Sequence, residues 1–346
     1  MSKIVSQQYT ERAGEAYEQL QNEEVDYLEK KMPPAPQGAE KMLISVDGAM
    51  VPLLHGVWAE VKTLVVGEVQ PPREEHGEQV IHTQQLSYFS HKVNAETFDR
   101  LALVEIHRRG IENAKEVAAV MDGAEWEQGF TEHHCSKATR ILDFPHAAEH
   151  ISPIGTCLHG ENTSETRTWI EERLHRLKHS GPEDLLVEFR ELQLQHPNAQ
   201  EIASNLAYLE KRKQHMQYPS FQAQGWPIGS GMVESGNKLV VEVRLKGAGM
   251  HWAEQNVNPL LTIRNILCSD RWKEEWPKIE IRLRQQNMLK RKQLHQTHEN
   301  IVRVKNWQPL DFPLLPPFVP QKKKPNPWRN FKFGKALYQR KDPPKL

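Results

Sequence analysis

The sequence has few cysteines and no long apolar run. Its 346 residues include only Cys135, Cys157 and Cys268, which are too far apart to indicate a disulfide framework. No apolar run approaches the ~18 residues that a membrane helix needs, and the N-terminus lacks the apolar core of a signal peptide. Hydrophobic residues make up 38% of the chain, and the mean hydropathy is −0.69. We therefore expect a soluble cytoplasmic protein without a membrane partner.

Several catalytic and metal-binding motifs are also missing. The sequence has no phosphate-binding P-loop pattern, and "GSG" at 229–231 lacks the spacing of a serine nucleophile elbow. His133, His134 and Cys135 could bind zinc together with Cys157 and His159, but their spacing matches no known zinc finger. These absences argue against an NTPase and against a serine hydrolase.

The formal net charge of zero hides a strong asymmetry along the chain. Residues 211–346 contain 26 Lys and Arg against 10 Asp and Glu, a balance of +16, so residues 1–210 carry −16. A basic second part suggests contact with a polyanion such as nucleic acid. The alternative is a pair of solvated faces that neutralise each other.

The pattern of apolar residues predicts an α/β fold. Three strands are expected at 41–54, 58–69 and 84–93, followed by an amphipathic helix at 94–111. Two further apolar runs lie in the stretches 115–126 and 138–151. We interpret the first as a strand that ends at Asp122-Gly123 and the second as a strand that ends at Asp143. A charged helical block spans about 161–217, and another helix runs from about 230 to 245. This order predicts a mixed sheet flanked by helices, with an all-helical insertion.

Carboxylates stand at positions where strands do not favour them. Asp47 lies in or at the end of the first strand, although aspartate is depleted in strands. Asp122 ends a later strand, although Asp-Gly after an apolar run is commonly only a turn. If these strands are neighbours, the two carboxylates converge and must share a proton or a cation. Oxygen ligands of this kind suit Mg²⁺ or Mn²⁺, and a third acid, Glu234, would complete a two-metal site. For Glu234 alone, a first-turn acid paired with Lys238 is the simpler interpretation.

Four stretches together resemble one family of enzymes. They are "SVDGAMVPL", "VMDGAEW", "ILDFPHAAEH" and "GWPIGSGMVESGNK…VRLKGAGMHW". The chain from about 42 to 275 is similar to bacterial insertion-sequence transposases of the Kra type, which are akin to the Mutator and hAT groups. The resemblance implies an RNase H-like fold and a DDE site that cuts and joins DNA.

The resemblance also implies roles for individual residues. The first acid of this fold lies on strand one, which matches Asp47. The second lies just after strand four, which matches Asp122, and the last lies on a helix after a helical insertion, which matches Glu234. These three would bind two Mg²⁺ or Mn²⁺ ions. Asp143 is the rival for the second position, and we expect His146 to contact a phosphate or orient the metal ligands.

Contacts with double-stranded DNA are expected at two places. Arg244 and Lys246 could hold a phosphate while Trp252 stacks on a frayed base, or this segment is a helix end followed by a core tryptophan. In the tail, Lys322, Lys323 and Lys324 could bind the DNA backbone, or the tail is simply solvated.

The leading hypothesis is a metal-dependent DNA transposase that acts on element ends and target DNA, as a homo-oligomer on DNA, in a bacterial cytoplasm at the nucleoid. Only about forty residues precede the first strand, without a clear DNA-reading motif, and a truncated copy is one interpretation of this departure from the family. The alternatives are an inactive remnant that only binds DNA and an RNase H-like nuclease without strand transfer.

The expected segments are 1–40 (helix and linker), 41–160 and 218–305 (catalytic domain), 161–217 (helical insertion) and 306–346 (basic Pro-rich tail).

Overall fold

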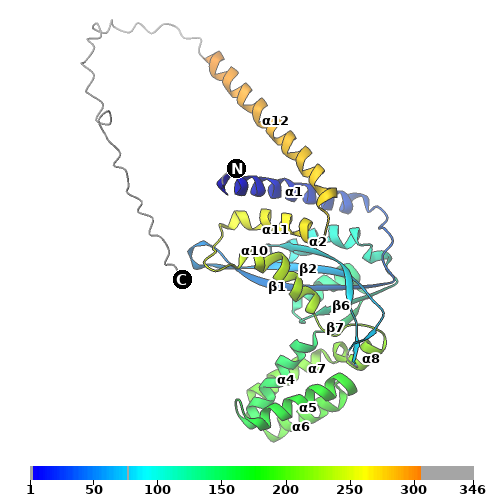
Figure 1. Cartoon of the computed structure of the whole chain (residues 1–346). Helices are drawn as coiled ribbons and strands as arrows, with labels where there is room; N and C mark the ends of the chain where they lie inside the picture. The colour runs from blue at the N-terminus through cyan, green and yellow to red at the C-terminus, as the bar shows by residue number, and fades with distance from the viewer. Residues whose placement is uncertain (1–2, 76–77, 305–346) are drawn as a thin grey trace, which may run out of the picture. The chain divides into compact units, whose positions relative to one another are not determined.

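The computed structural model describes residues 3–75 and 78–304 (Figure 1). The chain divides into two units, residues 1–288 and 289–346, and the second is described only as far as residue 304. The first unit contains every strand of the described residues. In the second unit, the described residues continue helix α12 (Trp272–Val304). The predicted basic tail, with Lys322, Lys323 and Lys324, lies outside the described residues.

A mixed five-stranded sheet forms the centre of the first unit (Figure 1). The strand order is β5-β2-β1-β6-β7, in which β1–β2 and β2–β5 pair antiparallel and β1–β6 and β6–β7 pair parallel. The predicted α/β class and the first three strands are confirmed. The strands of this sheet are β1 (Lys41–Pro52), β2 (Trp58–Val69), β5 (Thr83–His91), β6 (Glu116–Met121) and β7 (Thr139–Leu142).

The two faces of the sheet bury different side chains of β1, because successive residues of a strand point to opposite sides. Met42, Ile44 and Val46 belong to one apolar cluster, which also contains residues of α1 (Lys3–Lys31), α2 (Ala95–Arg108) and α3 (Glu125–Cys135). Leu43 and Val51 belong to the cluster on the other face. Asp47 has the same parity as Leu43 and therefore lies on this second face.

Helix α11 (Glu254–Cys268) contributes Leu260 and Leu261 to the cluster that contains Leu43. It also packs closely against α1. A Cβ atom on Gly14 of α1 would come within 2.0 Å of the Pro259 carbonyl oxygen, so only glycine allows the two helices to approach this closely.

A bundle of helices follows β7 (Figure 1). The strand that was expected to end at Asp143 is confirmed as β7, and the remainder of the stretch 138–151 is helical. Helix α4 begins at Phe144, because Asp143 caps it and Pro145 occupies its first turn. The bundle consists of α4 (Phe144–His159), α5 (Ser164–Ser180), α6 (Glu183–Gln195), α7 (Gln200–Lys211) and α8 (Tyr218–Ala223).

The helix predicted at 230–245 is present but irregular. It starts as α9 (Gly231–Gly236), continues as a π-helical segment, η4 (Asn237–Glu242), and ends as α10 (Val243–Leu245). A π-helical segment inside a helix is uncommon and frequently marks a functional site.

Short elements complete the described chain. Strands β3 (Arg73–Glu75) and β4 (Glu78–Val80) pair antiparallel in a separate two-stranded sheet. Short 3₁₀ turns are η1 (Leu54–Gly56), η2 (Ile111–Asn113) and η3 (Lys213–Met216). In residues 3–75 and 78–304, no helix has both the length and the apolar character that crossing a membrane requires.

Candidate metal centre

Asp47 and Asp122 come together because their strands are parallel neighbours. The β1–β6 register pairs Leu43 with Ala118 and Ile44 with Ala119, and the same offset continued along the strands places Asp47 beside Asp122. Glu127, in the first turn of α3, joins them. One carboxylate oxygen from each of the three residues lies within 4.8 Å of the others. Three acids, from strand β1, from the segment after β6 and from helix α3, thus meet in one place.

Hydrogen bonds hold the Asp47 carboxylate in place. Its Oδ1 accepts a hydrogen bond from the Gly48 backbone N–H at 2.6 Å, and its Oδ2 accepts one from Asn237 Nδ2 at 2.8 Å. Burial is the main reason why the pKa of Asp47 is raised, and the negative charges of Asp122 and Glu234 add to the rise.

Asp122 sits in a turn that the helical bundle supports. Its Oδ1 accepts a hydrogen bond from the Ala124 N–H at 2.8 Å, and Gly123 follows with φ +89°, a conformation that favours glycine. From the bundle, the Tyr208 hydroxyl donates to the Asp122 carbonyl oxygen at 2.6 Å, and Arg212 donates to the Gly123 carbonyl oxygen at 2.6 Å. Residues 86 and 89 positions further along the chain therefore fix the turn that carries this acid.

Glu127 is the member of the group that the sequence pattern does not single out. It is only 1% exposed, and its Oε2 accepts a hydrogen bond from the Gly123 N–H at 3.1 Å. Burial raises the pKa of Glu127 to about 10, and a hydrogen bond with Asp122 and the negative charge of Asp122 add to the rise. Glu127 is the third helical residue after the N-cap Ala124, where glutamate is commonly a capping residue, so its position in the sequence gave no distinct signal.

Asn237 adds an amide to the acidic group. It is the first residue of the π-helical segment and is 5% exposed. Its Nδ2 donates to Asp47, whereas its Oδ1 is buried and has no hydrogen-bond partner among the described residues. A buried polar atom without a partner is costly, so this oxygen is available to a bound ion or water.

The donor set fits a hard divalent cation. Buried carboxylates that repel one another, with raised pKa values at Asp47 and Glu127, are stabilised by a cation that replaces the shared proton. Carboxylate and amide oxygens are the ligands that Mg²⁺ and Mn²⁺ prefer.

Glu234 lies near this group but outside it. Among the described residues it is not one of those whose oxygens meet within 4.8 Å, and its exposed carboxylate is 4.0 Å from Lys238 Nζ. Its negative charge nevertheless contributes to the raised pKa of both Asp47 and Asp143. Glu234 is therefore close enough to act on the site electrostatically.

Asp143 forms hydrogen bonds that differ from those of Asp122. Its Oδ2 accepts a hydrogen bond from the His146 N–H at 3.2 Å and caps α4, while its Oδ1 accepts one from the Ser230 N–H at 2.6 Å. The carboxylate thus ties the start of α4 to the segment that leads into α9. Burial is the main cause of its raised pKa.

His146 lies on α4 among aromatic rings. Its Nδ1 is 3.2 Å from a carboxylate oxygen of Glu149, and its ring makes edge contacts with His150 and Tyr208. Because Tyr208 also bonds Asp122, His146 is connected to the acidic group through one intervening side chain. Its predicted contact with a phosphate stays a prediction.

Some of the contacts made by Arg244, Lys246 and Trp252 are internal to the fold. Trp252 Nε1 donates to the Leu245 carbonyl oxygen at 3.0 Å, and the Trp252 backbone N–H donates to the Pro52 carbonyl oxygen at the end of β1. The guanidinium of Arg244 lies 5.2 Å from the centre of the Trp252 ring, and Lys246 pairs with Glu242 at 2.8 Å. Arg244 and Lys246 remain exposed, so the expected DNA contact stays a prediction.

Comparison with known proteins gives no family for this chain. No protein-family model matches the sequence, and no curated protein matches it.

Proposed function

We propose that this chain is a DNA transposase of the DDE type, with an RNase H-like catalytic domain that cleaves and joins DNA strands. The observation that carries the proposal is the meeting of Asp47, Asp122 and Glu127 within 4.8 Å. The sheet topology supports it, because Asp47 lies on the first strand of the sheet and Asp122 directly follows the fourth along the chain. The transposase family that the sequence resembles has its first two acids at these places.

The acids would bind two Mg²⁺ or Mn²⁺ ions through Asp47, Asp122 and Glu127, with Glu234 as a further acid at the edge of the site. Bound divalent cations would activate water and stabilise the negative charge that develops on the phosphodiester. Glu127 would release its proton on binding, because the cation offsets both the burial and the repulsion from Asp122 that keep the carboxyl group neutral.

Other residues would position these ligands. Asn237 holds Asp47 Oδ2, and Tyr208 and Arg212 hold the turn after Asp122. Asp143 fixes the segment that precedes the helix of Glu234. Catalysis that depends on geometry needs such support, because small displacements of ligands lower rates strongly.

The proposed reaction has two steps. In the first, a water oxygen bonds to the phosphorus at the element end, and the 3′ oxygen leaves as a hydroxyl group. In the second, this 3′ hydroxyl attacks a phosphodiester of target DNA, and the 3′ oxygen of the target strand leaves. Exposed Arg244 and Lys246 are the proposed contacts with the DNA backbone, and a homo-oligomer assembled on DNA would bring two element ends together.

Cleavage of a labelled duplex that carries the DNA flanking the coding region tests the proposal. Asp47→Asn and Asp122→Asn should each lower Mg²⁺-dependent cleavage by at least about 100-fold, because each removes a charged ligand without changing side-chain size. Glu125→Gln is the matched control, since Glu125 starts the same helix α3 but its side chain is 92% exposed. Cleavage that persists in both aspartate variants would refute the assignment.

The same experiment separates the alternatives when unlabelled target plasmid is added. Labelled product joined to the plasmid supports a transposase. Cleavage without joining supports an RNase H-like nuclease, and binding without cleavage supports an inactive remnant.

A further inference from the structure

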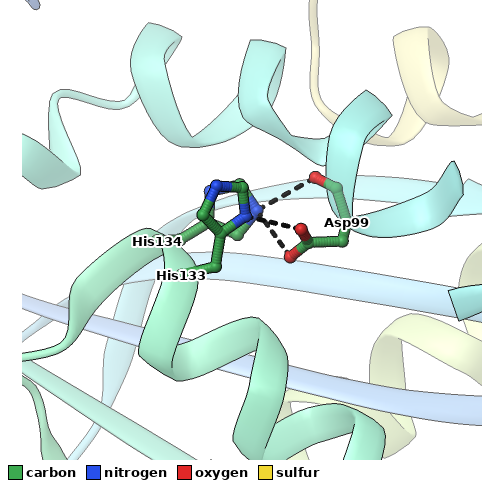
Figure 2. A group of neighbouring side chains, drawn as sticks. All are labelled: Asp99, His133 and His134. Atoms are coloured by element: carbon green, nitrogen blue, oxygen red, sulfur yellow. Dashed lines mark hydrogen bonds and ion pairs between the residues drawn. The ribbon is translucent and has the colours of Figure 1, made fainter. Parts of the chain in front are cut away.

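A second cluster of potential metal ligands lies away from the acidic group. Figure 2 shows His133 and His134 reaching from α3 toward Asp99 on α2. His133 Nδ1 lies 2.5 Å from Asp99 Oδ2, and His134 Nε2 lies 3.1 Å from Asp99 Oδ1. One ligand atom from each of the three residues lies within 4.8 Å of the others.

One histidine of the cluster is buried and the other is exposed. The His134 side chain is only 2% exposed, and its Nε2 is also 2.9 Å from the Asp99 backbone oxygen. The His133 side chain is 63% exposed. A ligand set of this kind is anchored on one side and open to solvent on the other, which leaves room for a water molecule or a further ligand.

The two rings and the carboxylate already face one another. Asp99 Oδ1 is buried and forms no hydrogen bond with a described residue, and its contact with His134 Nε2 at 3.1 Å is an ion pair. A neutral imidazole has one N–H, and His134 Nε2 is also 2.9 Å from the Asp99 backbone oxygen, so this single N–H cannot fully satisfy both oxygens. A cation bound by the carboxylate and the ring nitrogens would satisfy Oδ1.

We infer that Asp99, His133 and His134 form a binding site for a zinc-type transition-metal ion. Zinc binds imidazole nitrogen and carboxylate oxygen at about 2.0–2.2 Å, so neighbouring ligand atoms of a tetrahedral site lie about 3.3 Å apart. The distance from His133 Nδ1 to Asp99 Oδ2 is 2.5 Å and that from His134 Nε2 to Asp99 Oδ1 is 3.1 Å, so each ring nitrogen already lies near that spacing from a carboxylate oxygen.

The nature of the ligands separates this site from the acidic group. Imidazole suits zinc and similar ions, whereas the all-oxygen set of Asp47, Asp122 and Glu127 suits Mg²⁺. Cys135 follows His134 directly but does not belong to the cluster, and burial raises the pKa of its thiol to about 12, which disfavours the thiolate needed for binding.

The position of the site indicates a structural effect. The bound ion would link the C-terminal end of α3 to α2. Because Glu127 lies near the start of α3, the link would also hold the helix that carries this acid. Zinc should therefore stabilise the folded chain, whether or not the proposed transposase activity is correct.

Titration of the full chain with Zn²⁺ in excess Mg²⁺ tests the inference, because excess Mg²⁺ would compete with Zn²⁺ for the all-oxygen acidic group. One Zn²⁺ should bind per chain and raise the melting temperature. His133→Asn and Asp99→Asn should each weaken Zn²⁺ binding by more than about tenfold. His133→Asn is the decisive variant, because the exposed ring contributes little to packing and its loss should leave the metal-free melting temperature unchanged.

The matched control is the double variant His175→Asn/His179→Asn. These rings lie 4.4 Å apart on α5, but among the described residues no carboxylate joins them in a potential metal-binding group. The double variant should bind Zn²⁺ as the wild type does. Equal Zn²⁺ affinity in the wild type and in His133→Asn would overturn the inference, as would loss of binding in the control alone.

Discussion

The side-chain amide of Asn237 donates a hydrogen bond to Asp47 across 2.8 Å, although the two residues are 190 positions apart. The bond joins the π-helical segment to the first strand of the sheet. It fixes one oxygen of the Asp47 carboxylate, and the amide oxygen of Asn237 stays buried without a partner among the described residues. Asn237 is thus placed to orient a ligand of the candidate metal centre.

Asn237→Ala should lower Mg²⁺-dependent cleavage by about 10–100-fold, the usual effect of removing a residue that orients a metal ligand. The free energy of unfolding should change by only about 1 kcal/mol, the net value of one hydrogen bond. Single-turnover cleavage and urea unfolding measure the two quantities. Asn22→Ala, on the exposed side of α1, should leave both unchanged. Full activity in Asn237→Ala would exclude a positioning role.

The sequence alone predicts the sheet and the meeting of two acids. The alternation of apolar residues locates β1 and β2, and one aspartate in the first strand and one at the end of a later strand indicate that their carboxylates converge if the strands are neighbours. The remaining partners of the site depend on tertiary structure. Glu127 has the sequence pattern of a first-turn acid, and Asn237 shows its role only when the π-helical segment is packed against β1.

Boundaries were harder to predict where apolar residues run across two elements. The run at 138–151 contains both β7 and the start of α4, and only the capping hydrogen bonds of Asp143 separate them. Helix α3 was also missed, because its eleven residues carry several histidines and acids but few apolar side chains to reveal a period.

Tyr208→Phe should weaken the support of the Asp122 turn. The hydroxyl donates to the Asp122 carbonyl oxygen at 2.6 Å, and its loss leaves that oxygen without this donor. We expect a decrease in cleavage of about tenfold and a loss of about 1 kcal/mol in stability. Kinetic assays and thermal unfolding measure these effects. Tyr27→Phe is the control, because Tyr27 is 55% exposed, and it should change neither quantity. An unchanged cleavage rate in Tyr208→Phe would show that the helical bundle does not support the site.

The pair formed by Glu18 and His91 should make stability depend on pH. Glu18 Oε1 is 3.5 Å from His91 Nε2. Burial, helped by the charge of Glu15, raises the pKa of Glu18 from 4.5 to about 7, and burial lowers the pKa of His91 from 6.5 to about 4. Between about pH 4 and 7 both side chains are therefore neutral in the folded chain.

Because the folded pKa of Glu18 is raised, its stabilising contribution is fully present below about pH 4.5 and is lost as the pH rises through 7. Glu18→Gln, which stays neutral, should therefore match the wild type near pH 4.5 and be more stable by about 1–3 kcal/mol at pH 8. Urea unfolding at several pH values measures the difference. A constant difference across this range would show that Glu18 titrates normally.

Substitutions at Asp143 and Asp122 should separate a helix cap from a metal ligand. An asparagine side chain has one acceptor oxygen, so Asp143→Asn keeps only one of the two hydrogen bonds from His146 and Ser230. It should lose about 1 kcal/mol of stability and keep most of the cleavage, whereas Asp143→Ala, which loses both bonds, should lose about 2 kcal/mol of stability. Asp122→Asn should show the opposite pattern, with nearly unchanged stability and cleavage lowered by at least about 100-fold. Thermal unfolding and cleavage of the labelled duplex, measured on all three variants, compare the two residues directly. If Asp143→Asn abolishes cleavage while Asp122→Asn retains it, the second ligand is Asp143, and the hydrogen bonds that it makes to His146 and Ser230 must be rearranged when the cation binds.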